Sequence, residues 1–160
     1  MFYTNIPEVD SQESNPNRLL LIDDSKEITD ILEEIGNNAG YYVRSVNQYE
    51  LIIQEIEAHD PSVIFLDLHL GPADNFASEE IPREGLEILK FLSVNKSKAK
   101  IVIISGLSRR TRELNQYLGR DLNLHVIGSI SKPFNVSKVE EALLKLKKEV
   151  DQSFDEPFTI

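Results

Sequence analysis

Short apolar runs alternate along the chain with stretches in which apolar residues recur every three or four positions. The runs Leu19–Ile22, Val63–Leu66 and Ile101–Ile104 are nearly continuous, which is typical of strands covered on both faces of a parallel sheet. Tyr42–Val46 and Val126–Ile130 are the other strand candidates. In chain order, the pattern predicts five strands.

The stretches between these runs have helical period, with apolar residues at i, i+3, i+4 and i+7. The stripes are Ile28, Ile31, Leu32 and Ile35; Tyr49, Ile52, Ile53 and Ile56; a weaker set at Leu107, Thr111, Leu114 and Leu118; and Val136, Val139, Leu143, Leu146 and Val150. Repeated βα units imply right-handed crossovers. We therefore predict a doubly wound α/β domain, an open parallel sheet with helices on both faces.

Length and composition bound the organisation of the chain. With 160 residues, 41% of them hydrophobic, it has material for one core rather than two. The polar segments 1–17 and 151–160 are expected to be tails around a domain at 18–150. No apolar run is long enough to span a membrane, and the N-terminal stretch does not resemble a signal peptide.

Charge and cysteine usage exclude several classes of function. The absence of cysteine rules out disulfides, thiol catalysis and Cys-ligated zinc, and it fits a reducing, cytoplasmic environment. A formal net charge of -10 opposes phosphate backbones, so we expect no direct nucleic-acid binding. His59, His69 and His125 are widely spaced, and a zinc site is not expected.

Polar groups follow every predicted strand except the second, at the edge where an open parallel sheet binds its ligands. They are Asp23-Asp24, Asp67, Ser105-Gly106 and Lys132-Pro133. Carboxylates that converge repel each other unless a cation lies among them, and hard oxygen ligands favour Mg²⁺. The strand ends therefore predict a magnesium site.

Each of these groups also has an ordinary structural interpretation. Asp24 or Ser25 would cap a helix that begins near Lys26. Asp67 would be a turn residue, and Lys132 a solvated surface group. Taken together, an acid pair, an acid, a hydroxyl and a lysine in that order at four strand ends favour a functional site.

The segments LLLIDDS, VIFLDLHL, IVIISG and ISKPF resemble the receiver (response-regulator) domains of two-component signalling, from Arg18 to Val150. The resemblance implies a flavodoxin-like five-stranded sheet in the order 2-1-3-4-5. It makes Asp67 the phosphoacceptor and a metal ligand. Asp24 would bind Mg²⁺ (or Mn²⁺) directly and Asp23 through water, while the backbone carbonyl of His69 completes the protein's ligands.

The same resemblance assigns the two remaining polar residues and the partners. Ser105 would hydrogen-bond a phosphoryl oxygen, and Lys132 would pair with the Asp67 carboxylate or its phosphoryl group. The Lys132–Pro133 bond is expected to be cis. The donor would be a histidine kinase or phosphotransfer protein, and the signal would leave through contacts with an unidentified protein, with a homodimer left open. The domain would assist its own phosphorylation and dephosphorylation without being an enzyme otherwise.

Two features depart from the family pattern. Residues 69–84 form a longer, acidic segment than usual after the phosphoacceptor, interpreted either as a flap beside it or as a solvated insertion. Ser129 stands three residues before Lys132, where receivers often carry an aromatic switch residue.

Three alternatives stay in view. A metal-dependent phosphohydrolase would have a second acid at the position of His69. A flavin or dinucleotide module would have a phosphate-binding loop in place of Asp23-Asp24. The strongest rival is a pseudo-receiver that binds partners without being phosphorylated. The presence of all five polar residues weighs against it.

Overall fold

The computed structural model describes residues 14–68, 83–105, 117–148 and 158–159. Its strands are β1 (Arg18–Ile22), β2 (Tyr42–Val46), β3 (Val63–Asp67), β4 (Lys100–Ser105), β5 (His125–Ser131) and β6 (Phe158–Thr159). Its helices are α2 (Lys26–Asn38), α3 (Ile52–His59), α4 (Arg83–Val94) and α6 (Val136–Lys148), with a 3-10 turn η1 (Tyr49–Leu51) before α3 and a helical stretch at 117–121.

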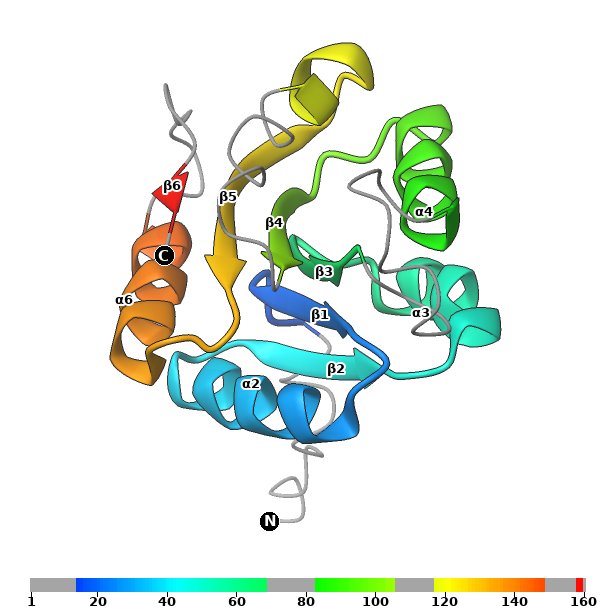
Figure 1. Ribbon diagram of the computed structural model, residues 1–160. Helices are drawn as coiled ribbons and strands as arrows, with labels where there is room; N and C mark the ends of the chain where they lie inside the picture. The colour runs from blue at the N-terminus through cyan, green and yellow to red at the C-terminus, as the bar shows by residue number, and fades with distance from the viewer. Residues whose placement is uncertain (1–13, 69–82, 106–116, 149–157, 160) are drawn as a thin grey trace, which may run out of the picture.

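The strands form one parallel sheet in the order β2-β1-β3-β4-β5-β6. In Figure 1, α2 and α6 lie on one side of this sheet and α3 and α4 on the other. The doubly wound fold and the order 2-1-3-4-5 are thereby confirmed. The expectation that 151–160 is only a tail needs correction, because Phe158–Thr159 adds a sixth strand beside Gly128 and Ser129 of β5.

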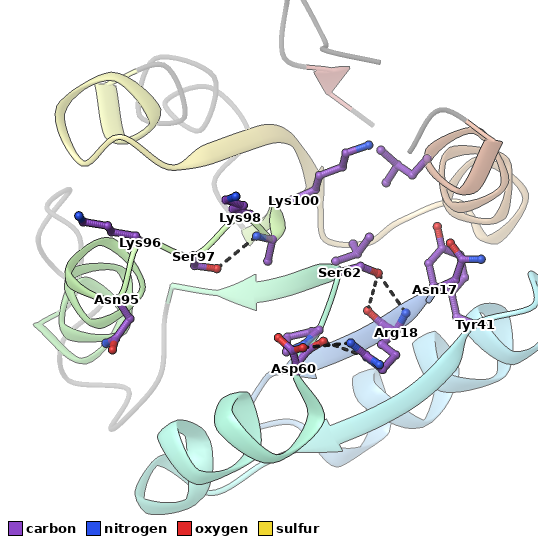
Figure 2. A pocket seen from close by; sticks show the side chains of 14 residues that line it. Asn17, Arg18, Tyr41, Asp60, Ser62, Asn95, Lys96, Ser97, Lys98 and Lys100 are labelled. Atoms are coloured by element: carbon purple, nitrogen blue, oxygen red, sulfur yellow. Dashed lines mark hydrogen bonds and ion pairs between the residues drawn. The ribbon is translucent and has the colours of Figure 1, made fainter. Parts of the chain in front are cut away.

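At the amino-terminal edge of the sheet, the first residue of β1 is tied to the turn before β3. The Arg18 backbone N–H donates to Ser62 Oγ at 3.0 Å, and the Ser62 hydroxyl donates back to the Arg18 carbonyl at 3.1 Å (Figure 2). The Arg18 guanidinium donates to the Asp60 carbonyl at 2.9 Å and pairs with its carboxylate at 3.1 Å. These bonds fix where β1 starts relative to β3.

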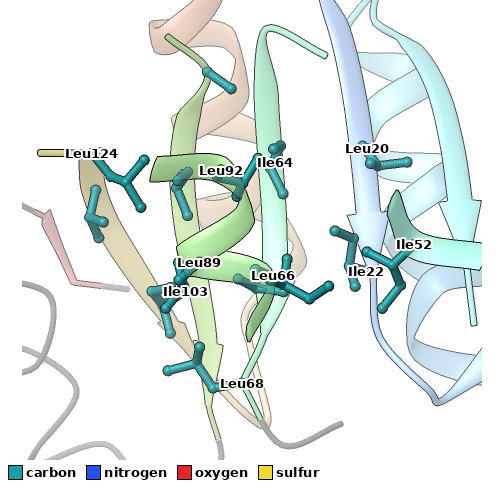
Figure 3. Packing of buried hydrophobic residues seen from close by; sticks show 14 of the residues in the cluster. Leu20, Ile22, Ile52, Ile64, Leu66, Leu68, Leu89, Leu92, Ile103 and Leu124 are labelled. Atoms are coloured by element: carbon teal, nitrogen blue, oxygen red, sulfur yellow. The ribbon is translucent and has the colours of Figure 1, made fainter. Parts of the chain in front are cut away.

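The apolar runs bury both faces of the central strands. Successive side chains of a strand point to opposite faces, so Leu20 and Ile22 pack beneath α3 and α4 (Figure 3), while Leu19 and Leu21 pack beneath α2 and α6. All four side chains are fully buried. Two cores, one on each face, explain why these runs are continuous rather than alternating.

The helix predictions hold with local corrections. Ser25 caps α2 by accepting a hydrogen bond from the Ile28 N–H at 3.3 Å. The stripe residues Ile31 and Ile53 lie at the margins of their helices and are 39% and 43% exposed. Tyr49 belongs to the 3-10 turn η1 rather than to α3. Of the weaker stripe, Leu118 is buried, and the other three residues lie outside the described residues.

His59, the last residue of α3, is buried between β1 and β2. Its Nε2 lies 3.1 Å from the Leu19 carbonyl and 3.2 Å from the Tyr42 carbonyl. Because both neighbours are acceptors, Nε2 carries the proton. Burial lowers the pKa of His59 below its ordinary 6.5, and the two carbonyls oppose that shift only in part.

We expect acidification to destabilise the domain through His59. A lowered pKa means that the neutral ring is favoured by folding, so this stability is present above pH 6.5 and is lost as pH falls through the folded-state pKa. Urea unfolding between about pH 7.5 and about pH 5.5 would measure it. His59→Gln keeps an N–H donor without titrating, so it should lose less stability on acidification than the wild type. Equal losses would contradict the assignment.

Candidate functional site

Three elements bring the polar residues of the strand ends to one edge of the sheet. Asp23 directly follows β1, Asp67 ends β3 and Lys132 directly follows β5. The parallel registers, with Ile22 beside Leu66 and Asp67 beside Ile104, place these ends at the same level. Asp23 and Asp67 are 1% and 3% exposed, whereas Asp24 reaches solvent.

The backbone around Asp23 is held from three directions. Its N–H donates to the Val46 carbonyl at 3.3 Å, and its carbonyl accepts from the Asn47 side chain at 2.8 Å. Its Oδ1 accepts from the Ser25 N–H at 2.9 Å, which leaves Oδ2 directed to the rest of the site. Asn47 also donates to Thr29 Oγ1 at 2.9 Å, so it joins the end of β2 to α2.

Lys132 bridges the two buried carboxylates. Its Nζ donates to Asp67 Oδ2 at 3.0 Å and lies 2.8 Å from Asp23 Oδ2. Burial by itself would lower the pKa of Lys132, but its interactions with Asp23 and Asp67 outweigh burial and raise that pKa above its ordinary value. The lysine is therefore a fixed cation within the site.

One ammonium does not neutralise three acids. Asp23, Asp24 and Asp67 each present a carboxylate oxygen within 4.8 Å of the others. Burial and the charge of Asp67 raise the pKa of Asp23, and burial and the charge of Asp23 raise the pKa of Asp24. Both shifts report that the site holds more negative charge than it stabilises.

This excess charge is what a divalent cation would relieve, and the donor set fits a hard ion such as Mg²⁺. The Lys132 ammonium, 2.8 Å from Asp23 Oδ2, offsets only part of this charge, because Asp24 and Asp67 belong to the same cluster. The residues present therefore fit the metal.

The structure brings Asp23, Asp24, Asp67 and Lys132 together, as the sequence predicted. The Lys132–Pro133 bond is cis, which confirms that expectation. Ser105 is the last residue of β4 and pairs with Ser131 of β5, so its backbone lies at the same edge, but its side chain is not among those described. His69 and most of the segment 69–84 lie outside the described residues.

Sequence reasoning assigned no polar group to the exit of the second strand. Asn47 directly follows Val46 there, and its side chain donates a hydrogen bond to the Asp23 carbonyl. A single asparagine after a strand is an ordinary turn signal. Asn47 differs from an ordinary turn residue only because β2 lies beside β1 in the sheet.

Ser129 is fully buried in β5, and its Oγ has no hydrogen-bond partner in the described part of the chain. A buried hydroxyl without a partner costs about 1 kcal/mol or more. We expect Ser129→Ala to raise the free energy of unfolding by about 1 kcal/mol, measured by urea denaturation. Ser131→Ala, one pleat further along the strand and half-buried, is the control. A clear loss of stability in Ser129→Ala would show that the hydroxyl has a partner after all.

Comparison with known proteins identifies the class of protein. The family model described as the response regulator receiver domain matches residues 19–144, so the chain belongs to that family. It is 27% identical over 138 residues to the nitrogen assimilation regulatory protein NtrX of Azorhizobium caulinodans, covering 82% of this chain and 28% of that protein. The chain thus spans less than a third of this relative.

Solved structures share the fold. A response regulator from Colwellia psychrerythraea has a TM-score of 0.65 at 22% identity, covering 84% of this chain and 98% of that one. The chemotaxis protein CheY4 of Vibrio cholerae has a TM-score of 0.62 at 18% identity, covering 81% and 97%. Among the described residues, no helix is both long and apolar enough to cross a membrane.

Proposed function

We propose that this receiver domain accepts a phosphoryl group on Asp67 from a histidine kinase or phosphotransfer protein and passes the signal on through protein contacts. The observation that carries the proposal is the contact of Lys132 with both Asp67 and Asp23 beside the three-carboxylate cluster. A buried acid with an adjacent cation suits a nucleophile that must receive a dianionic group.

In this proposal an oxygen of Asp67 attacks the phosphorus of a phosphohistidine. The new O–P bond forms as the N–P bond breaks, and the electron pair of that bond returns to the imidazole. The phosphoryl group brings negative charge into a site where Lys132 already lies 3.0 Å from the attacking carboxylate of Asp67. Lys132 would move its hydrogen bond from the carboxylate to a phosphoryl oxygen, and Ser105 would donate from the end of β4.

Asp23, Asp24 and Asp67 would hold Mg²⁺, together with the backbone carbonyl of His69. The ion would supply positive charge to the phosphoryl oxygens. Residues of the chain position the two buried carboxylates. Asn47 and Ser25 hold Asp23 in place through the hydrogen bonds already described, and Lys132 keeps Asp67 oriented.

Intact-protein mass spectrometry after incubation with acetyl phosphate and Mg²⁺ tests the proposal. One phosphoryl addition, mapped to Asp67 and removed by hydroxylamine, is expected. An unchanged mass under these conditions, with the domain folded by circular dichroism, would favour the pseudo-receiver.

We expect Mg²⁺ to stabilise the domain by mass action, with a gain of about 1.4 kcal/mol when free Mg²⁺ is about tenfold above its dissociation constant. Thermal melts in EDTA and in Mg²⁺ would measure the gain. Asp24→Ala should abolish this gain, because it removes a carboxylate from the cluster that would hold the ion. Packing should be unaffected, because Asp24 is exposed. Asp121→Ala, also exposed, should leave it unchanged. A wild type that melts at the same temperature with and without Mg²⁺ would contradict the metal site.

A further inference from the structure

A groove of about 490 Å³ opens at the amino-terminal edge of the sheet. It is bordered by the start of β1, the turn before β3 and the segment between α4 and β4. Asp23 and Asp67 stand at the other ends of β1 and β3, so the groove is separate from the acidic site.

The charge of the groove is opposite to that of the whole chain. Among the described residues, its lining has four cations, Arg18, Lys96, Lys98 and Lys100, and a single carboxylate, Asp60. The formal net charge of the protein, by contrast, is -10. Arg18 is paired with Asp60. Within the described ranges, neither Lys96 nor Lys98 forms an ion pair. The groove is therefore a local cationic site on an acidic protein.

Local structure turns the lysines of this segment outward. In the sequence Lys96-Ser97-Lys98-Ala99-Lys100, the alternate residues face the protein: Ala99 is 6% exposed, and Ser97 Oγ accepts from the Ala99 N–H at 3.2 Å. Lys96 and Lys98 are exposed. Figure 2 shows the lysine-bearing segment on one side of the groove and Arg18, Asp60 and Ser62 on the other.

We propose that this groove binds an extended acidic segment of a protein partner. Alternate residues of an extended chain lie about 6.6 Å apart on one face, so alternate Asp or Glu side chains would present several carboxylates together to the cations that line the groove. An apolar small molecule is a poor fit, because four cationic side chains line the groove. A long phosphate backbone is disfavoured by the formal net charge of -10 of the whole chain.

The position of the groove decides what such binding would do. Arg18 in the groove and Asp23 in the acidic site are five positions apart along the chain, which corresponds to roughly 16 Å along the strand. A partner held in the groove leaves Asp67 accessible to its phosphoryl donor. The groove is thus an anchoring site that works in both phosphorylation states, in contrast to a surface that reads the phosphoryl group.

Fluorescence anisotropy of the full chain with a labelled peptide of alternating Asp and Ser would test this inference. Lys98→Glu removes an exposed cation with no ion pair among the described residues, so folding should be unaffected, and we expect binding to weaken by about tenfold. Lys138→Glu, on the exposed start of α6 near the opposite edge, is the control and should bind within about twofold of the wild type. Amide NMR shifts on binding should centre on Arg18, Ser62 and Lys98.

Three results would overturn the inference. Absence of peptide binding, or equal weakening in Lys98→Glu and Lys138→Glu, would show that no specific groove site exists. Oligothymidylate bound as tightly as the peptide would assign the groove to polyanions in general. Affinity that changes with beryllofluoride and Mg²⁺ would make the groove a readout of phosphorylation, whereas unchanged affinity supports the anchor.

Discussion

Asp67→Asn is expected to take up no phosphoryl group from acetyl phosphate while the domain remains folded. The amide oxygen is not a nucleophile toward phosphorus, and no other carboxylate of the site lies at the end of β3, hydrogen-bonded to Lys132 at 3.0 Å. Intact mass and circular dichroism measure the two parts of this prediction. Asp121→Asn, on the exposed surface, is the control and should be phosphorylated like the wild type.

The same substitution should not cost stability in metal-free buffer. Burial and, after it, repulsion by Asp67 raise the pKa of Asp23, and Lys132 keeps its ion pair with Asp23 when Asp67 becomes neutral. We expect the melting temperature in EDTA to equal or exceed that of the wild type. Full phosphoryl uptake by Asp67→Asn would mean that the acceptor is another residue, and a large fall in melting temperature would mean that Asp67 is chiefly structural.

The fold and most of the candidate site were predictable because both depend on local patterns. The continuous apolar runs report strands buried on two faces, and the polar residues that follow them lie at one edge by the geometry of a parallel sheet. Ser25 at the start of α2 was predictable from its capping preference.

Other features depend on contacts between distant residues, which no local pattern contains. Asn47 matters only because β2 lies next to β1, where its side chain reaches the Asp23 carbonyl. Lys132 was expected to pair with Asp67, and its second contact with Asp23 follows from how the two strand ends are placed. β6 has two residues, too few to show a strand period.

Lys132→Met should destabilise the domain by about 2 kcal/mol in metal-free buffer at neutral pH. Removing one partner of a buried ion pair costs about 3–5 kcal/mol, and a smaller loss is expected here because the Lys132 side chain is 25% exposed and its pairs are partly screened. Methionine preserves most of the side-chain volume, so the loss reports charge. Urea unfolding in EDTA measures it, with Lys145→Met on the exposed face of α6 as the control.

The cause of this loss is testable by combining substitutions. If uncompensated carboxylates destabilise Lys132→Met, adding Asp67→Asn removes one of them, and the double variant should be more stable than Lys132→Met alone. Mg²⁺ should also restore part of the stability, because the cation replaces the missing ammonium charge among Asp23, Asp24 and Asp67. Charge repulsion thus predicts that Asp67→Asn gains more stability in the Lys132→Met background than in the wild type, which is a departure from additivity. A double variant whose change in stability equals the sum of the two single changes would instead assign Lys132 to packing and leave the acidic site without its fixed cation.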